Sequence, residues 1–185
     1  KEFAGSACVH FSKFSINKSI FMKKILFVVF AATLSLNVTA QLKTTAVCPV
    51  FSVDILKGRV NSDLLTSSTV GQIKTKFPCF TSAEDESATA KCGGGVFYKD
   101  KDIYFYTARD YIEIGPNFKG KLSLPLMGAN RNALFKWLGN PKIKDVNWDA
   151  FETAYGILIL YYNKSGKINK IQFSVKGADT IQLCE

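Results

Sequence analysis

A leader-like segment divides this chain and determines how much of it remains to fold. A basic start at Met22–Lys24 precedes an apolar run over residues 25–36, and a run of small residues ends at Ala40. This combination is typical of a secretory signal peptide, which we predict over residues 22–40. The apolar run is shorter than the ~20 residues that span a bilayer, so a retained anchor or a buried helix is the less favoured alternative.

The predicted signal peptide separates residues 1–21, interpreted as upstream or expression-derived sequence outside the fold, from a mature domain over residues 41–185. Cleavage leaves no transmembrane segment, and Gln41 stands where a lipid anchor needs a cysteine. Residues 41–185 hold 19 of the 24 basic and 14 of the 15 acidic side chains, so their formal net charge is +5 instead of +9. This modest charge and the predicted export argue against a nucleic-acid partner.

The predicted mature domain contains four cysteines and no histidine, because His10 precedes it. The missing histidine excludes Ser-His-Asp and Cys-His nucleophiles and histidine metal ligands. An even cysteine number in an exported chain predicts disulfides. Of the three pairings, closeness along the chain favours Cys79 with Cys92, and the outer positions favour Cys48 with Cys184. A four-cysteine zinc site is the alternative, but CxxC spacing is missing, and we predict no metal and no cofactor.

Strand and helix patterns follow a similar order in two parts of the mature domain, residues 50–115 and 121–185. Helical spacing predicts one helix from Ser67 or Ser68 to Phe77 and another over residues 131–138. We expect an α+β fold in which an antiparallel sheet carries short helices on one face, as two tandem similar units or as one domain without internal symmetry. Strands are expected at residues 50–56, 96–98, 103–107, 111–114, 121–126, 155–162, 167–175 and 179–184, and loops at 81–91 and 142–153.

Tyrosines alternate with apolar residues in two of the expected strands. Successive side chains of a strand point to opposite faces, so Tyr104 and Tyr106 share one face, which short helices on the other face leave open. The same alternation separates Tyr161 from Tyr162, and either one can lie on the open side. Exposed tyrosine is rigid and has a polar tip, which suits protein recognition. We therefore expect these four tyrosines to bind a partner, with ordinary sheet packing as the alternative.

Other motifs do not indicate a catalytic site. Gly93–Gly95 lacks the Lys-Ser or Lys-Thr of a phosphate loop, which leaves a flexible strand entry or close backbone packing as its interpretation. Arg109-Asp110 with Glu113, or Asp149 with Glu152, could form a glycosidase-like carboxylate pair. Their spacing does not place two groups across a cleft, and we predict no catalytic residue.

The second half of the chain carries a family resemblance. Asn130–Pro141, followed by Tyr155–Tyr162 and Gly166–Ile171, resembles the small unit of β-lactamase-inhibitor-protein-like proteins and of BamE-type outer-membrane assembly lipoproteins. In those units a short helix ending in a Gly-x-Pro-like stop precedes antiparallel strands. Residues 121–175 match this layout better than residues 54–114. The resemblance implies tandem helix-on-sheet units and a binding role through the open sheet face, although the missing lipidation cysteine departs from the BamE type.

These observations favour an exported binding protein over an enzyme. We expect a non-catalytic, inhibitor-like protein in the periplasm or outside the cell, with another protein as its partner. The alternatives are an immunity protein against a secreted toxin, a carboxylate-dependent cell-wall or glycan hydrolase, and a structural component of the cell envelope.

Overall fold

A computed structural model describes residues 47–184, so the predicted signal peptide and residues 1–21 lie outside the described residues. The described part is mostly β with two short α-helices. Within residues 47–184 no helix has the length and apolar character needed to cross a membrane. The strands are β1 (Ser52–Asp54), β2 (Arg59–Val60), β3 (Leu64–Leu65), β4 (Ser82–Glu84), β5 (Gly95–Tyr98), β6 (Ile103–Tyr106), β7 (Tyr111–Ile114), β8 (Lys121–Leu122), β9 (Ile143–Lys144), β10 (Trp148–Thr153), β11 (Gly156–Tyr162) and β12 (Ile168–Ser174). The helices are α2 (Val70–Lys76) and α3 (Phe135–Leu138), with 3-10 turns η2 (Lys91–Gly93), η3 (Thr107–Arg109) and η4 (Arg131–Ala133).

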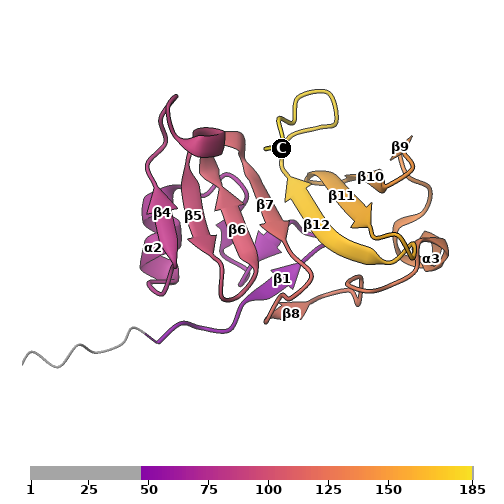
Figure 1. The fold of residues 1–185 in the computed structure, drawn as a ribbon, viewed down its shortest axis with the longest axis horizontal. Coiled ribbons are helices and arrows are strands. Elements are labelled where there is room, and N and C mark those ends of the chain that lie inside the picture. Colours follow the sequence, from indigo (N-terminus) through magenta and orange to yellow (C-terminus); the bar gives the residue numbers. More distant parts are fainter. Residues whose placement is uncertain (1–46, 185) are drawn as a thin grey trace, which may run out of the picture. The chain divides into compact units, whose positions relative to one another are not determined.

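An eight-stranded antiparallel sheet forms the larger layer, in the order β4-β5-β6-β7-β12-β11-β10-β9 (Figure 1). It consists of two consecutive runs, β4–β7 and β9–β12, which meet where β7 pairs with β12. In that pair Ile112 lies opposite Phe173 and Glu113 opposite Gln172. The predicted antiparallel sheet is therefore confirmed, and β11 and β12 form a hairpin that turns through residues 163–167.

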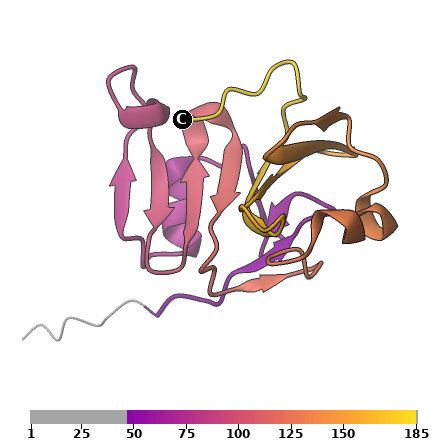
Figure 2. The ribbon, with the colours of Figure 1, turned by 45° about the vertical axis from the view of Figure 1, so that its right-hand side comes forward.

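A small four-stranded sheet, in the order β3-β2-β1-β8, forms a second layer. Strand β1 pairs antiparallel with β2 and parallel with β8, which joins the start of the described chain to its middle. The Asn61 side chain accepts a hydrogen bond from the Ser52 N–H at 2.8 Å and donates to the Val50 carbonyl at 2.9 Å. Figure 2 shows α2 behind the strands β4–β7.

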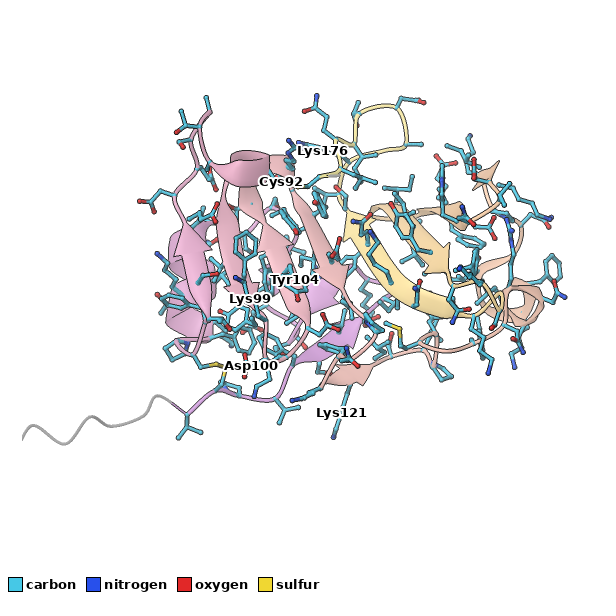
Figure 3. The ribbon with its side chains drawn as sticks, viewed as in Figure 1. Cys92, Lys99, Asp100, Tyr104, Lys121 and Lys176 are labelled. Atoms are coloured by element: carbon cyan, nitrogen blue, oxygen red, sulfur yellow. A yellow bond between two sulfur atoms is a disulfide. The ribbon has the colours of Figure 1, made fainter. Side chains whose placement is uncertain are left out.

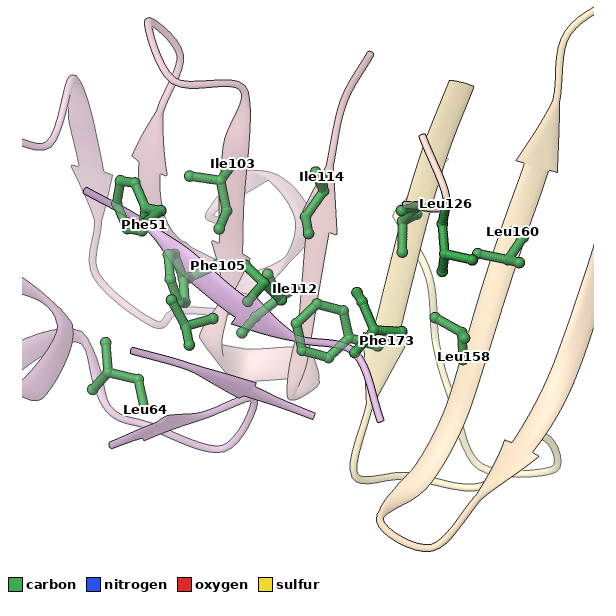
Figure 4. Close-up of a cluster of buried hydrophobic side chains, with 14 of the residues drawn as sticks. Phe51, Leu64, Ile103, Phe105, Ile112, Ile114, Leu126, Leu158, Leu160 and Phe173 are labelled. Carbon is green, nitrogen blue, oxygen red and sulfur yellow. The ribbon is translucent and has the colours of Figure 1, made fainter. Parts of the chain in front are cut away.

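The hydrophobic core lies between the two sheets and includes residues of both helical segments (Figure 4). Phe51 of the lead into β1 stacks on Phe77 with ring centroids 4.3 Å apart, and Tyr98 of β5 meets Phe51 edge-on at 5.0 Å. The buried Tyr98 hydroxyl donates to the Phe77 carbonyl at 2.7 Å, so its one polar group is satisfied. Removing these side chains from water is the main driving force for the fold.

The N-cap of helix α2 lies one or two residues later than the sequence indicates. Thr69, not Ser67 or Ser68, is its N-cap: the Thr69 hydroxyl accepts from the Gln72 N–H at 3.3 Å, and the Gln72 side chain accepts from the Thr69 N–H at 2.9 Å. This reciprocal capping box satisfies two N–H groups that the first turn leaves unpaired. Ser68 has a different role, since its hydroxyl accepts from the Leu65 N–H.

Three further expectations were wrong. The helix expected over residues 131–138 is divided into η4 and α3. Residues 81–91 and 142–153, expected as loops, contain β4, β9 and β10. Residues 179–184 form no strand. Strand β10 was missed because its buried face includes the acidic Asp149, which breaks the apolar alternation on which the prediction depended.

Both disulfides join cysteines other than the favoured pairs. Cys48 is bonded to Cys79, with Cα atoms 5.5 Å apart, and Cys92 to Cys184, with Cα atoms 5.4 Å apart. Two disulfides are typical of a protein in an oxidising compartment.

The register of the β4–β5 hairpin explains the corrected pairing. Ser82 lies opposite Phe97, and Glu84 lies opposite Gly95. Cys79 therefore precedes one end of the hairpin, whereas Cys92 lies in the loop at the other end. The twelve residues between the two cysteines run along β4 to the opposite end of the hairpin instead of closing a short loop.

Candidate binding surface

The face of the large sheet that points away from the core carries the predicted tyrosines of β6. Ile103 and Phe105 are buried in the core, so their neighbours Tyr104 and Tyr106 point to the opposite side, where both are partly exposed. Pairing of the strands places Tyr104 between Phe97 of β5 and Glu113 of β7. The strand order thus builds one row of side chains from neighbouring strands.

This row borders an open hollow of about 350 Å³. Figure 1 shows no helix or strand of residues 47–184 in front of β4–β7, and Figure 3 shows Tyr104 and Lys99 over these strands, with Cys92 at their far end. We call the hollow and its lining the tyrosine surface. Its lining residues are Ser82, Glu84, Cys92, Phe97, Lys99, Tyr104, Tyr106, Glu113, Lys170 and Cys184.

Aromatic contacts fix the shape of the tyrosine surface. Phe97, only 8% exposed, forms the floor, with its ring centroid 6.3 Å from Tyr104 and 5.3 Å from Tyr106. Tyr106 also stacks on the buried Tyr111 at 4.5 Å. Rings held by several neighbours lose little side-chain entropy when a ligand binds, which favours recognition.

A polar network crosses the junction of the two runs of strands. Gln172 donates to Glu113 at 2.6 Å and accepts from the Tyr161 hydroxyl at 2.8 Å. The Lys170 ammonium lies 3.7 Å from a Glu113 oxygen and 4.1 Å from the Tyr161 ring centroid. Tyr161 therefore lies on the same face as Tyr104, but its hydroxyl is held in this network.

Burial raises the pKa of both surface tyrosines. For Tyr104, burial is the largest cause of a raised pKa, followed by its hydrogen bond to Asp102, at 3.1 Å. Burial and the charge of Glu113 raise the pKa of Tyr106 to about 12. Both hydroxyls are protonated hydrogen-bond donors at neutral pH, and they lose their protons at higher pH than an exposed tyrosine does.

Tyr162 does not belong to this surface. It is 8% exposed, lies in the core cluster, and donates its hydroxyl to Asp149 at 2.7 Å. The guanidinium of Arg131 holds the same carboxylate through two nitrogens and lies 4.8 Å from the Tyr162 ring centroid. The hydrogen bond with Asp149 raises the pKa of Arg131. This arrangement leaves Tyr162 a structural role.

The structure does not bring the candidate carboxylates together as pairs. Asp149 lies on the core side of β10, three positions from Glu152 and therefore on the opposite face. Asp110 forms an ion pair with Lys176 at 3.0 Å, and Glu113 is held by Gln172. Among residues 47–184 no group of three or more His, Cys, Asp or Glu is placed to hold a metal ion.

The run β9–β12 has the same outward face, but here the C-terminal segment covers it. Ala150, Ile157 and Ile159 are at most 4% exposed. Ala178, Ile181 and Leu183 pack against these three residues, together with Trp148 and Tyr161. We call residues 176–184 the cover segment. The strand expected over residues 179–184 falls in this segment, which forms no strand.

Gly94 shows why the glycine run precedes β5. Its φ is +96°, and a Cβ atom there would lie 2.5 Å from the Asp85 carbonyl oxygen. The run thus allows close packing of backbone beside the hollow, one of its two predicted interpretations.

No protein family model, curated protein or solved structure matches this chain. The resemblance to β-lactamase-inhibitor-protein-like and BamE-type units therefore stays a prediction.

Proposed function

We propose that this chain is an exported, non-catalytic binding protein that contacts another protein through the tyrosine surface. One observation carries the proposal: Tyr104 and Tyr106 line an open hollow, whereas the cover segment closes the neighbouring half of the same face. A sheet that buries one half of its outward face and leaves the aromatic half accessible is a good candidate for an interface.

The chemistry of the hollow favours a protein partner. Its volume of about 350 Å³ is near the lower end of small-molecule pockets, and its lining combines aromatic rings with Lys99, Lys170, Glu84 and Glu113. Tyrosine surrounded by charges of both signs resembles the centre and rim of protein–protein interfaces. A partner loop that inserts an apolar side chain over Phe97 and has a charge of each sign beside it would complement the hollow.

We also propose that the fold consists of two tandem units. The runs β4–β7 and β9–β12 each follow a helical segment, as tandem units of the inhibitor-like resemblance would. Under this view the two units share one sheet, and only the first presents a free binding face. A secreted toxin or hydrolase, which the chain would neutralise, is the partner class that the resemblance favours.

The test is capture of partners from an envelope extract by the purified mature protein. The double variant Tyr104→Ala/Tyr106→Ala should lose the partner. Phe135→Ala is the matched control, because Phe135 of α3 is a 66% exposed aromatic outside the tyrosine surface, and it should capture normally. Equal recovery of the partner by the wild type and the double variant would refute binding through the tyrosine surface.

Export has a separate test. The protein purified from the periplasm or medium of a producing strain should begin at Gln41, as read by N-terminal sequencing. A protein that retains residues 22–40 would contradict cleavage.

A further inference from the structure

The cover segment is attached at its end by a disulfide that is also part of the tyrosine surface. Cys92 and Cys184 both line the hollow, and their bond joins the loop before β5 to the last described residue of the chain. The other disulfide, Cys48–Cys79, packs against the core cluster on the opposite side of the sheet. The two bonds therefore have different surroundings in one molecule.

Besides the Cys92–Cys184 disulfide and the apolar packing, polar contacts from three consecutive residues hold the cover segment. Arg109 donates to the Leu183 carbonyl at 2.6 Å, Asp110 pairs with Lys176, and the Tyr111 hydroxyl accepts from the Cys184 N–H at 3.1 Å. Within the segment, the N–H of Ile181 donates to the Gly177 carbonyl at 3.1 Å. No backbone ladder joins the segment to the sheet in the described part of the chain.

The residues beneath the segment form an apolar strip continuous with the tyrosine surface. Ile159 lies opposite Gln172, which lies opposite Glu113, so one row of paired residues runs from the strip to Tyr104. The segment itself shows what the strip binds: a short chain without strand pairing that contributes small and branched apolar side chains.

We propose that residues 176–184 are a removable cover, and that reduction of Cys92–Cys184 opens the strip of Ala150, Ile157 and Ile159 to an apolar segment of the partner protein. This inference rests on the proposed function, because the strip extends the surface on which that partner lies. In the oxidised protein the contact is confined to the tyrosine surface, and in the reduced protein it extends across both runs of strands.

The redox step is an ordinary thiol–disulfide exchange with a dithiol. One thiolate of the dithiol attacks a sulfur of the Cys92–Cys184 bond and forms a mixed disulfide, and its second thiol then displaces the remaining cysteine. The dithiol becomes a disulfide. Its two protons pass to the sulfurs of Cys92 and Cys184, which become thiols. Dithiothreitol supplies this chemistry in the test tube.

Release of the cover is tested without any partner, in the full mature chain. The variant C92S/C184S should show about tenfold or faster amide hydrogen exchange in residues 177–184, and stronger fluorescence of an added apolar dye. The matched control C48S/C79S should leave both readings at their wild-type values, and the β11–β12 amides should stay protected in both variants. Unchanged exchange in residues 177–184 of C92S/C184S would overturn the inference, as would joint loss of protection in β11 and β12.

A peptide with the sequence of residues 176–184, with serine in place of Cys184, tests what the strip accepts. Added to C92S/C184S, it should lower the dye signal, whereas the same peptide with serine in place of Ile181 and Leu183 should not. Equal effects of the two peptides would contradict an apolar docking strip. These readings do not involve Tyr104. Failed capture experiments would therefore refute the proposed function without refuting the removal of the cover segment.

Discussion

Tyr106 and Tyr111 stack with ring centroids 4.5 Å apart and ring planes 17° apart. Tyr106 faces the open hollow, while the Tyr111 hydroxyl accepts a hydrogen bond from the Cys184 N–H. The ring that a partner would meet is therefore supported by a residue that also holds the end of the cover segment. Changes at Cys184 should therefore alter the environment of the Tyr106 ring.

Tyr111→Phe tests this link through the acidity of Tyr106. The substitution keeps the stacked ring and removes the hydroxyl whose hydrogen bond lowers the pKa of Tyr106, against the burial that raises it to about 12. The pKa of Tyr106 should therefore rise further in the variant. NMR titration of ¹³C-labelled tyrosine measures it, and a pKa that stays the same or falls would contradict the contact.

Alkaline pH should destabilise the fold. Burial is the largest cause of raised pKa values at Tyr98, Tyr104, Tyr106, Tyr111, Tyr155 and Tyr162. The unfolded chain loses these protons near the ordinary tyrosine pKa of about 10, while the folded chain keeps them to higher pH. The contribution of these buried tyrosines to the free energy of unfolding is therefore fully present below about pH 10. It is lost as pH rises through their folded pKa values.

Urea unfolding at pH 8 and at about pH 11 measures this loss. Tyr106→Phe removes one of the raised groups and serves as the comparison, so its free energy of unfolding should fall less between the two pH values. A free energy that is equal at both pH values in the wild type would contradict the burial of these hydroxyls.

The cluster of Arg131, Asp149 and Tyr162 should matter for stability and not for binding. Asp149 is 3% exposed, and its removal leaves the guanidinium and the phenol without their shared acceptor. Asp149→Ala should lower the free energy of unfolding by about 3 kcal/mol, near the low end for a buried pair because Arg131 keeps contact with water. Tyr162→Phe should cost about 1 kcal/mol, the worth of one hydrogen bond.

Both values come from urea unfolding curves, and partner capture provides the second reading. Tyr162→Phe should capture the partner as well as the wild type does. A loss of capture without a loss of stability would show that Tyr162 contributes to binding.

Thr107→Val should stabilise the protein. The Thr107 hydroxyl is the one buried side-chain oxygen in residues 47–184 without a hydrogen-bond partner, and the residue is 6% exposed. Valine has nearly the same shape and replaces an unsatisfied polar group with a methyl group. The free energy of unfolding should rise by about 1 kcal/mol, and a decrease would mean that the hydroxyl has a partner such as water.

Local patterns in the sequence were enough to predict the antiparallel strands and the outward direction of Tyr104 and Tyr106. Strand alternation depends only on neighbouring residues, and Ile103 and Phe105 identify the core side without further information. Tyr161 and Tyr162 were different, because both neighbours in that strand are apolar and the alternation gives no sign of which face is buried. The choice depends on Asp149, a partner from another strand.

The disulfide pairing and the cover segment could not be predicted for a related reason. Cys184 reaches Cys92 because the end of β12 pairs with the start of β7, which in turn pairs with the end of β6. These are contacts between residues far apart in sequence, and they place Ser174 and Tyr106 at the same end of the sheet. Closeness along the chain carried no information about that arrangement.

Site-specific photo-cross-linking at position 104 tests the central claim most directly. The mature protein with a benzophenone amino acid in place of Tyr104 is irradiated in envelope extract, beside the same probe in place of Phe135. We predict one protein adduct from position 104 that excess unlabelled wild type removes and that excess Tyr104→Ala/Tyr106→Ala does not. No adduct at position 104, or the same adduct from both positions, would contradict binding through the tyrosine surface.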